Sequence, residues 1–272
     1  MQQIINFLIR YKTFLLYLLL LLISFVFTFQ SHSYHQSKFL NSANYISGSL
    51  YAFSDNFTSY FALREENEAL LKENEVLRHQ LYNQESYAAS PDSSKAAYKV
   101  LRGKVVKNSF SGQRNYITID QGKSDSIAQD MGVITDKGIL GIVENTSNGF
   151  ASVQSILNDK SKINAKIKNS NHFGSLVWDT KKYTTVQLID IPRLAPLSIG
   201  DTIVTGAMSS IFPENIPIGT ISKFDLDSSK SFYFIDIALF NDMTNVKNVY
   251  IIQDLNRAEV LELEAETQTD DR

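Results

Sequence analysis

Cysteine is absent from the 272-residue sequence, which excludes disulfides, thiolate-bound metals and a lipid-modified cysteine. The part of the chain that folds must therefore be stabilised by its own core. A strong excess of one charge is absent as well, because 26 basic residues stand against 29 acidic ones and the formal net charge is −3. Since no basic arm accompanies this balance, we do not expect the chain to bind nucleic acid.

Histidine is scarce, and the catalytic motifs that use it are missing. The four histidines are His32, His35, His79 and His172, and only the last lies where we expect β-structure. A Ser-His-Asp protease needs an imidazole beside its nucleophile, yet no Gly-x-Ser-x-Gly or Gly-Asp-Ser-Gly surrounds any serine. No histidine pair has metal-ligand spacing, and no glycine-rich phosphate loop occurs. We therefore expect a protein that is not an enzyme and has no catalytic residues, metal or cofactor.

One long apolar run is present. Residues 13–29 read TFLLYLLLLLISFVFTF and carry no charge. A helix of this length is about 25 Å long, shorter than a hydrocarbon core of about 30 Å, so Tyr11 and Lys12 would have to complete the span. A cleaved signal peptide is the alternative, but residues 30–33 offer no A-x-A-like cleavage site. We predict a single transmembrane anchor at 13–29. Residues 1–12, which are basic and free of acids, are expected to form a cytoplasmic tail, and the bulk of the chain is expected to lie outside the cytoplasm.

Residues 30–86 are expected to form an extended segment and a coiled-coil helix. Leucine or asparagine recurs in alternating steps of four and three at Leu63, Asn67, Leu70, Asn74, Leu77 and Leu81. Charged residues fill the positions between them. Because a polar residue on such a seam fixes register and oligomeric state, the two asparagines favour self-association. We predict a dimeric stalk; the alternative is a helix that folds back onto the β-region.

The pattern changes after a linker at 87–98 that contains serine, proline and alanine. Short apolar segments of period two follow, separated by glycine, asparagine, aspartate and proline, which is typical of barrels or sandwiches. We expect strands at 103–107, 115–120, 132–135, 139–143, 151–157, 163–167, 174–178, 184–189, 202–205, 219–224, 232–239 and 247–252.

These segments predict a mainly β fold with an N-terminal helix: one transmembrane helix, a coiled-coil stalk and two small antiparallel β-barrels. We assign 99–158 to the first barrel, completed by 220–253, and 159–219 to the second. The tail 254–272 is acidic and lacks aromatic residues, so we expect it to be disordered.

Two stretches carry a specific resemblance. The first is VKNSFSGQRNYITIDQGKSDSIAQDMGVITDKGILGIVENTSNGFASVQSILN, and the second is GDTIVTGAMSSIFPENIPIGTI. The second holds the pairing G-D-x-I-V-T with F-P-x-x-I-P-I-G, through Gly200, Asp201, Phe212, Pro213, Pro217, Ile218 and Gly219. In this combination, after a span and a helix reading R-E-E-N-E-x-L, the chain resembles the MreC family of rod shape-determining proteins of bacterial cell-wall elongation.

The sequence departs from the family pattern at a few places. Many members have Ser-Gly where this chain has Gly206 and Ala207, and they often have glycine where it has Asn215. Such differences affect a local turn or surface loop. The motifs also have purely structural interpretations: Asp136-Lys137-Gly138 predicts a tight hairpin, and Pro213 fits a connection between strands.

The resemblance implies a non-catalytic scaffold that maintains cell shape by self-associating and by binding and regulating enzymes of peptidoglycan synthesis. The partners it implies are MreD, the actin-like MreB system, a class B penicillin-binding transpeptidase and a RodA-type glycosyltransferase, at the bacterial cytoplasmic membrane. For partner contacts we select Phe173, Trp178 and Tyr183, although a lone tryptophan on a strand can equally face the core.

Alternatives from other classes are a periplasmic adaptor of an efflux or secretion system, and a coiled-coil protein of cell division. An adaptor normally has a two-helix hairpin between halves of a lipoyl-like domain, whereas this sequence predicts one helix with all β-structure after it.

Overall fold

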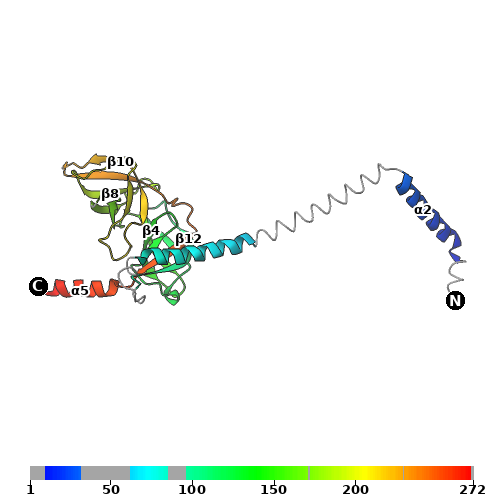
Figure 1. The fold of residues 1–272 in the computed structure, drawn as a ribbon, viewed down its shortest axis with the longest axis horizontal. Coiled ribbons are helices and arrows are strands. Elements are labelled where there is room, and N and C mark those ends of the chain that lie inside the picture. Colours follow the sequence, from blue (N-terminus) through cyan, green and yellow to red (C-terminus); the bar gives the residue numbers. More distant parts are fainter. Residues whose placement is uncertain (1–9, 32–61, 85–95, 171, 229, 271–272) are drawn as a thin grey trace. The chain divides into compact units, whose positions relative to one another are not determined.

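The structure is a computed structural model that describes residues 10–31, 62–84, 96–170, 172–228 and 230–270 (Figure 1). The chain separates into two units, Met1–Glu68 and Ala69–Arg272, which we describe one at a time. The extended segment predicted after residue 31 lies outside the described residues, and so does the linker as far as residue 95. The last residue assigned to the linker, Tyr98, already belongs to a strand.

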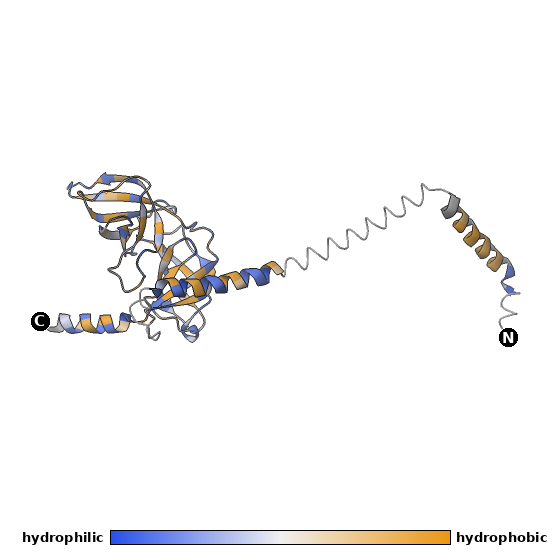
Figure 2. Ribbon diagram, in the orientation of Figure 1, coloured by the Kyte–Doolittle hydropathy of each residue, from blue (hydrophilic) through white to orange (hydrophobic). Residues whose placement is uncertain are grey.

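The first unit contains helix α2, Lys12–Ser31. Its large apolar side chains are mostly exposed, and in Figure 2 the ribbon of this helix has the hydrophobic colour over most of its length. Within the ranges that the structure describes, no helix meets the length and apolarity needed to cross a membrane. A further helix occupies residues 62–82 and continues from the first unit into the second.

The first barrel is a closed sheet with the strand order β1-β12-β3-β4-β5-β2. All its neighbouring strands are antiparallel, and a short 3-10 helix, η1 (Lys123–Asp125), follows β2. The strands are β1 (Tyr98–Asn108), β2 (Arg114–Ile119), β3 (Gly132–Ile134), β4 (Ile139–Thr146), β5 (Ala151–Asn158) and β12 (Asn248–Asp254).

The second barrel is also closed and antiparallel, with the order β10-β11-β8-β7-β6-β9. Its strands are β6 (Ile163–Ile167), β7 (Phe173–Val177), β8 (Thr185–Pro192), β9 (Thr202–Thr205), β10 (Pro217–Leu226) and β11 (Phe232–Leu239). The twelve observed strands correspond to the twelve predicted ones, so the prediction of two small barrels is confirmed.

The division of strands between the barrels differs from the prediction. We expected 220–253 to complete the first barrel, but β10 and β11 close the second one. Only β12 returns to the first barrel, where it pairs with β1 and β3. The reason is that a period-two pattern tells which face of a strand is buried but not which strand lies beside it.

The C-terminal tail is the second correction. We expected disorder over 254–272, but β12 extends to Asp254 and helix α5 occupies Arg257–Asp270. Alanine, leucine and glutamate, which form helices readily, make up most of its first turns, and Glu259 lies in the first turn, where a negative charge stabilises the helix.

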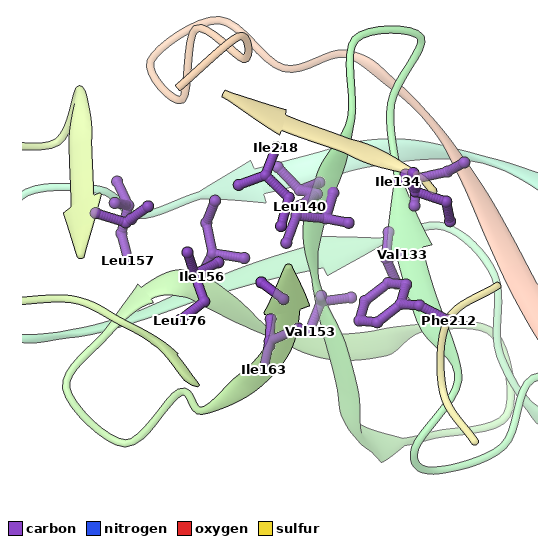
Figure 3. Packing of buried hydrophobic residues seen from close by; sticks show 14 of the residues in the cluster. Val133, Ile134, Leu140, Val153, Ile156, Leu157, Ile163, Leu176, Phe212 and Ile218 are labelled. Atoms are coloured by element: carbon purple, nitrogen blue, oxygen red, sulfur yellow. The ribbon is translucent and has the colours of Figure 1, made fainter. Parts of the chain in front are cut away.

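One hydrophobic cluster runs through both barrels. Strand residues that alternate inward supply it, among them Val153 and Leu140 from the first barrel and Leu176 from the second (Figure 3). The helix over 62–82 contributes partly buried side chains to the same cluster. The barrels and the end of this helix are therefore stabilised by a common core.

Candidate functional site

The leucine seam of the helix over 62–82 is exposed. Leu63, Leu70, Leu77 and Leu81 have relative exposures of 62%, 50%, 53% and 62%. Monomeric proteins rarely leave such a row of large apolar side chains in water without a function. Asn74, between two of them, donates from Nδ2 to the carbonyl oxygen of Leu70 at 2.9 Å. Self-association through the seam remains a prediction.

A neighbouring face of the same helix packs on the first barrel. Leu71 and Tyr82 lie against the hydrophobic core, and the Arg78 guanidinium lies over the Tyr250 ring, 4.9 Å from its centroid. Arg78 also donates to the Tyr82 hydroxyl at 3.2 Å and to the carbonyl oxygen of Asp136 at 3.3 Å. The alternative of a helix folded back on the β-region thus holds for this face, while the seam stays open.

Asn83 joins the end of the helix to β1. Its side chain is fully buried, accepts a hydrogen bond from the Tyr98 amide at 2.9 Å and donates to the Tyr98 carbonyl at 2.8 Å. It also donates to the His79 carbonyl at 2.7 Å, near the end of the helix. The side-chain amide of Asn83 therefore bonds both backbone groups of Tyr98, the first residue of β1, as the backbone of a neighbouring strand would.

Three tyrosines at this contact have raised pKa values. Burial raises the pKa of Tyr82, and the charge of Arg78 and its hydrogen bond partly oppose that effect. Burial also raises the pKa of Tyr98, and the negative charge of Asp254 adds to the effect. For Tyr250, burial raises the pKa while the Arg78 charge lowers it. The contact therefore favours the neutral phenols.

The family motif lies where the two barrels meet. Phe212 is 1% exposed and lies beside Val133 of the first barrel (Figure 3). A Cβ atom on Gly132 would come within 2.6 Å of the Phe212 ring, so only glycine leaves room for the phenyl group. Ile218, at the start of β10, is also buried in the shared core.

A second part of the junction is polar. Asn241, which follows β11, donates from Nδ2 to the carbonyl oxygen of Ile139 at 2.8 Å and accepts from the Thr135 hydroxyl. Thr135 lies in the predicted hairpin, which is confirmed: its amide donates to the Gly138 carbonyl at 2.8 Å. These buried groups satisfy one another's hydrogen bonds and so hold the end of β11 to the β3–β4 turn.

The remaining motif residues shape turns. Gly200 has φ +93°, a conformation that favours glycine, and Asp201 accepts a hydrogen bond from the Ser198 amide at 2.7 Å. The Pro213 carbonyl accepts from the Thr205 hydroxyl at 2.6 Å. Gly219 lies against the Ala238 backbone, too close for a side chain. The motif residues therefore serve turns, hydrogen bonds and close packing within the fold, in agreement with the purely structural interpretation of the motif.

The residues selected for partner contacts have different environments. Trp178 is 7% exposed and donates from Nε1 to the Lys182 carbonyl at 2.8 Å, so the prediction that its ring contacts a partner is wrong. Tyr183 is 48% exposed, and its ring meets that of Phe110 edge-on at 5.8 Å. Phe173 is half-buried. For Phe173 and Tyr183, partner contact remains a prediction.

Sequence reasoning missed Arg78, Asn83, Asn241 and Arg257. Arg78 is one of the charged residues between the seam positions, and such residues on a helix are normally in water. The sequence signal that was available for Arg78 is its place four residues before Tyr82, a spacing that puts both side chains on one helix face.

Chemistry beyond binding finds little support in the described residues. No group of three or more metal-ligating side chains occurs among them. His172 lies in a loop, where its Nδ1 is 3.2 Å from the Ser170 hydroxyl oxygen. The feature best suited to binding is the exposed leucine seam, which lies on a helix whose other face packs against the first barrel.

Comparison with known proteins identifies the family. The sequence pattern described as "Rod shape-determining protein MreC, barrel core" matches residues 105–253, which is more than half of the chain. The chain belongs to the MreC family. Among curated MreC members, the cell shape-determining protein of Listeria monocytogenes is 27% identical over 177 residues, 64% of this chain and 57% of that protein. The Bacillus subtilis protein is 26% identical over 208 residues, 66% of this chain and 71% of that protein.

Solved MreC structures share the fold. The chain matches the structure titled MreC from Listeria monocytogenes with a TM-score of 0.57 and 26% identity, covering 71% of this chain and 94% of that one. A Pseudomonas aeruginosa MreC crystal structure matches with a TM-score of 0.52 at 20% identity and covers 56% of this chain. The family match therefore establishes membership, and the solved structures show the same fold.

Proposed function

We propose that this chain is a non-catalytic scaffold that maintains cell shape, self-associates and regulates peptidoglycan synthesis enzymes at the bacterial cytoplasmic membrane. The observation that carries this function is the exposed leucine seam on a helix whose other face is fixed to the first barrel. A seam in this position links two copies without unfolding either barrel. Family membership supplies the cellular process, since curated members are named cell shape-determining proteins.

Membrane anchoring is part of this proposal. The uncharged run 13–29 lies within α2, and the large apolar side chains described in it are mostly exposed. Because the run is shorter than the hydrocarbon core, the flanking Tyr11 and Lys12 would sit at the headgroups. Residues 1–12 would then be cytoplasmic and the barrels periplasmic. The proposed partners are MreD, the MreB system, a class B penicillin-binding transpeptidase and a RodA-type glycosyltransferase.

The test of this function combines assembly with cell shape. Two aspartates would be placed on the seam in the variant Leu70→Asp/Leu77→Asp. The matched control, Ala69→Asp/Val76→Asp, adds the same two charges on exposed positions away from the seam. Each full-length chain is purified in detergent for light scattering and is also expressed in a rod-shaped bacterium depleted of its own MreC.

We expect the wild-type chain and the control to be dimers and to restore rods. The seam variant should be monomeric and leave the cells round. A seam variant that remains dimeric, or that restores rods as a monomer, would show that the leucine seam is not the basis of function. His172→Ala should restore rods like the wild type, because the scaffold uses no histidine chemistry.

A further inference from the structure

We propose that the first barrel of one copy contacts the helix of a second copy, so that Lys137 and Arg78 of one chain meet Glu73 of the other. This contact rests on the proposed self-association and specifies its geometry. It makes the β3–β4 turn, residues 135–138, part of the dimer interface.

The heptad positions place these residues. On a seam with leucine at d (Leu70, Leu77), Glu73 is a g position and Arg78 is the e position five residues later. In a parallel two-stranded coil, the g residue of one helix lies beside the e residue five positions on in the other. Glu73 of the second copy therefore lies beside Arg78 of the first.

The barrel occupies the same side of the helix as the e positions. Leu71, at e, packs on the core, and Arg78, one heptad later, donates to the Asp136 carbonyl at 3.3 Å. A helix that joins the seam must consequently pass next to the β3–β4 turn. Lys137 follows Asp136 directly, and its side chain is exposed.

The charges at this place suit an arriving carboxylate. The Arg78 guanidinium is half-buried and already engaged with Tyr82, Asp136 and the Tyr250 ring, so it offers an arriving carboxylate its positive charge and not a free donor. Glu73 is exposed and makes no ion pair within the described part of the chain. Other charges surround these groups: Asp136, Glu75 and Arg102 act on the Tyr250 hydroxyl together with Arg78, and Asp242 lies within the influence of Lys137. An incoming Glu73 thus meets two cations, Arg78 and Lys137, held by one barrel.

The parallel orientation follows from the asparagines. Asn67 and Asn74 both occupy a positions, which face their own counterparts in a parallel, in-register pair. In an antiparallel pair each asparagine would face a leucine and lose its partner. Nδ2 of Asn74 already donates to the Leu70 carbonyl, which leaves Oδ1 to accept a hydrogen bond from the facing Asn74.

The absence of cysteine makes a direct test possible, because every crosslink then joins introduced thiols only. Two differently tagged full-length copies are co-expressed, one with Glu73→Cys and the other with Lys137→Cys, and treated in detergent with a short bismaleimide. A reference pair carries Asn74→Cys in both copies and reports the seam itself. The matched control joins Lys72→Cys to Lys137→Cys, since Lys72 is the neighbour of Glu73 but points away from the seam.

We expect the reference pair and the Glu73/Lys137 pair to form mixed-tag dimers, while the Lys72/Lys137 pair stays at background. Crosslinking of the reference pair without the Glu73/Lys137 product would overturn this contact and leave the self-association intact. Failure of both pairs would overturn the seam dimer and this contact together. A product as abundant in the Lys72 control would show unspecific collision and would also count against the proposal.

Discussion

Gly138 is the residue at which the β3–β4 turn touches the start of β10. Its φ is +152°, and a Cβ atom there would fall on the carbonyl oxygen of Pro217. Gly138→Ala should therefore lower the free energy of unfolding by about 2 kcal/mol or more, through strain and a backbone clash. Urea unfolding followed by Trp178 fluorescence measures this change.

Gly149→Ala is the control, since no atom lies within 4 Å of the added methyl group. It should change the free energy of unfolding by less than about 0.5 kcal/mol. Equal losses for the two variants would contradict the assignment of Gly138 to the junction.

The three tyrosines at the helix contact predict instability in alkali. Burial keeps the pKa values of Tyr82, Tyr98 and Tyr250 above the ordinary 10.0, so the unfolded chain loses these protons first. The stability of the neutral phenols is fully present below pH 10 and is lost as pH rises toward the folded-state pKa values. The urea midpoint should thus fall between about pH 9 and about pH 11.

Tyr98→Phe isolates one share of this effect, because the variant removes one titrating hydroxyl and keeps the ring. Its urea midpoint should fall less steeply with pH than that of the wild type. A midpoint that does not change across the alkaline range in the wild type would argue against burial as the cause of the raised pKa values.

At the level of single residues, the sequence predicted which glycine and proline residues form turns better than it predicted which side chains are buried. It indicated that Gly138 belongs to a tight hairpin and Pro213 to a connection between strands, because few residues adopt those backbone conformations. It did not reveal that Trp178 faces the core, since alternation gives two faces and the tryptophan fits either. The contact between Arg78 and Tyr250 was unpredictable for a different reason, because Tyr250 lies far along the sequence.

At the level of elements, helix α5 begins with a contact that the sequence did not reveal. Arg257 donates from Nη2 to Asp130 Oδ2 and from Nη1 to the Ser210 hydroxyl, each at 3.0 Å. Arg257→Ala should free the start of α5 and lower its amide protection, with a stability cost of about 1 kcal/mol because Asp130 is partly exposed. Hydrogen exchange of the peptides covering α5 is the measurement.

Glu264→Ala provides the comparison on the same helix, because its side chain is exposed and shares none of these contacts. Protection of α5 should be unchanged in this variant. If Arg257→Ala leaves protection at the wild-type level, the contact to Asp130 does not hold the helix in place.

Elements were the scale at which the sequence was most informative. All twelve strands and the helix over 62–82 were predicted, since periods of two and of 3.6 are local signals. Pairing is not local, which is why β10 and β11 were assigned to the wrong barrel. The disorder expected for the tail was wrong because acidic composition was weighted above the helix propensity of alanine, leucine and glutamate.

At the level of the whole molecule, the shared core predicts that both barrels unfold together. Phe212 belongs to a loop of the second barrel but lies against Gly132 and Val133 of the first. Phe212→Ala should cost about 3–5 kcal/mol, the range for a buried phenylalanine, and destabilise both barrels. Hydrogen exchange should show β4 and β7 losing protection to the same extent.

Phe232→Ala tests whether the location of the ring matters. Phe232 is 44% exposed on β11, so its removal should cost less than about 1 kcal/mol. Loss of protection in β7 alone after Phe212→Ala would mean that the barrels unfold independently.

The return of β12 to the first barrel has a consequence for biosynthesis. The strand that closes this barrel is made after the entire second barrel, so β1 and β3 wait with unpaired edges while some ninety intervening residues emerge from the ribosome. A nascent chain interrupted anywhere before Asn248 would keep those edges open and be an easy substrate for quality-control proteases. Because its last strand is made last, the first barrel can close only in a chain that has been synthesised through β12.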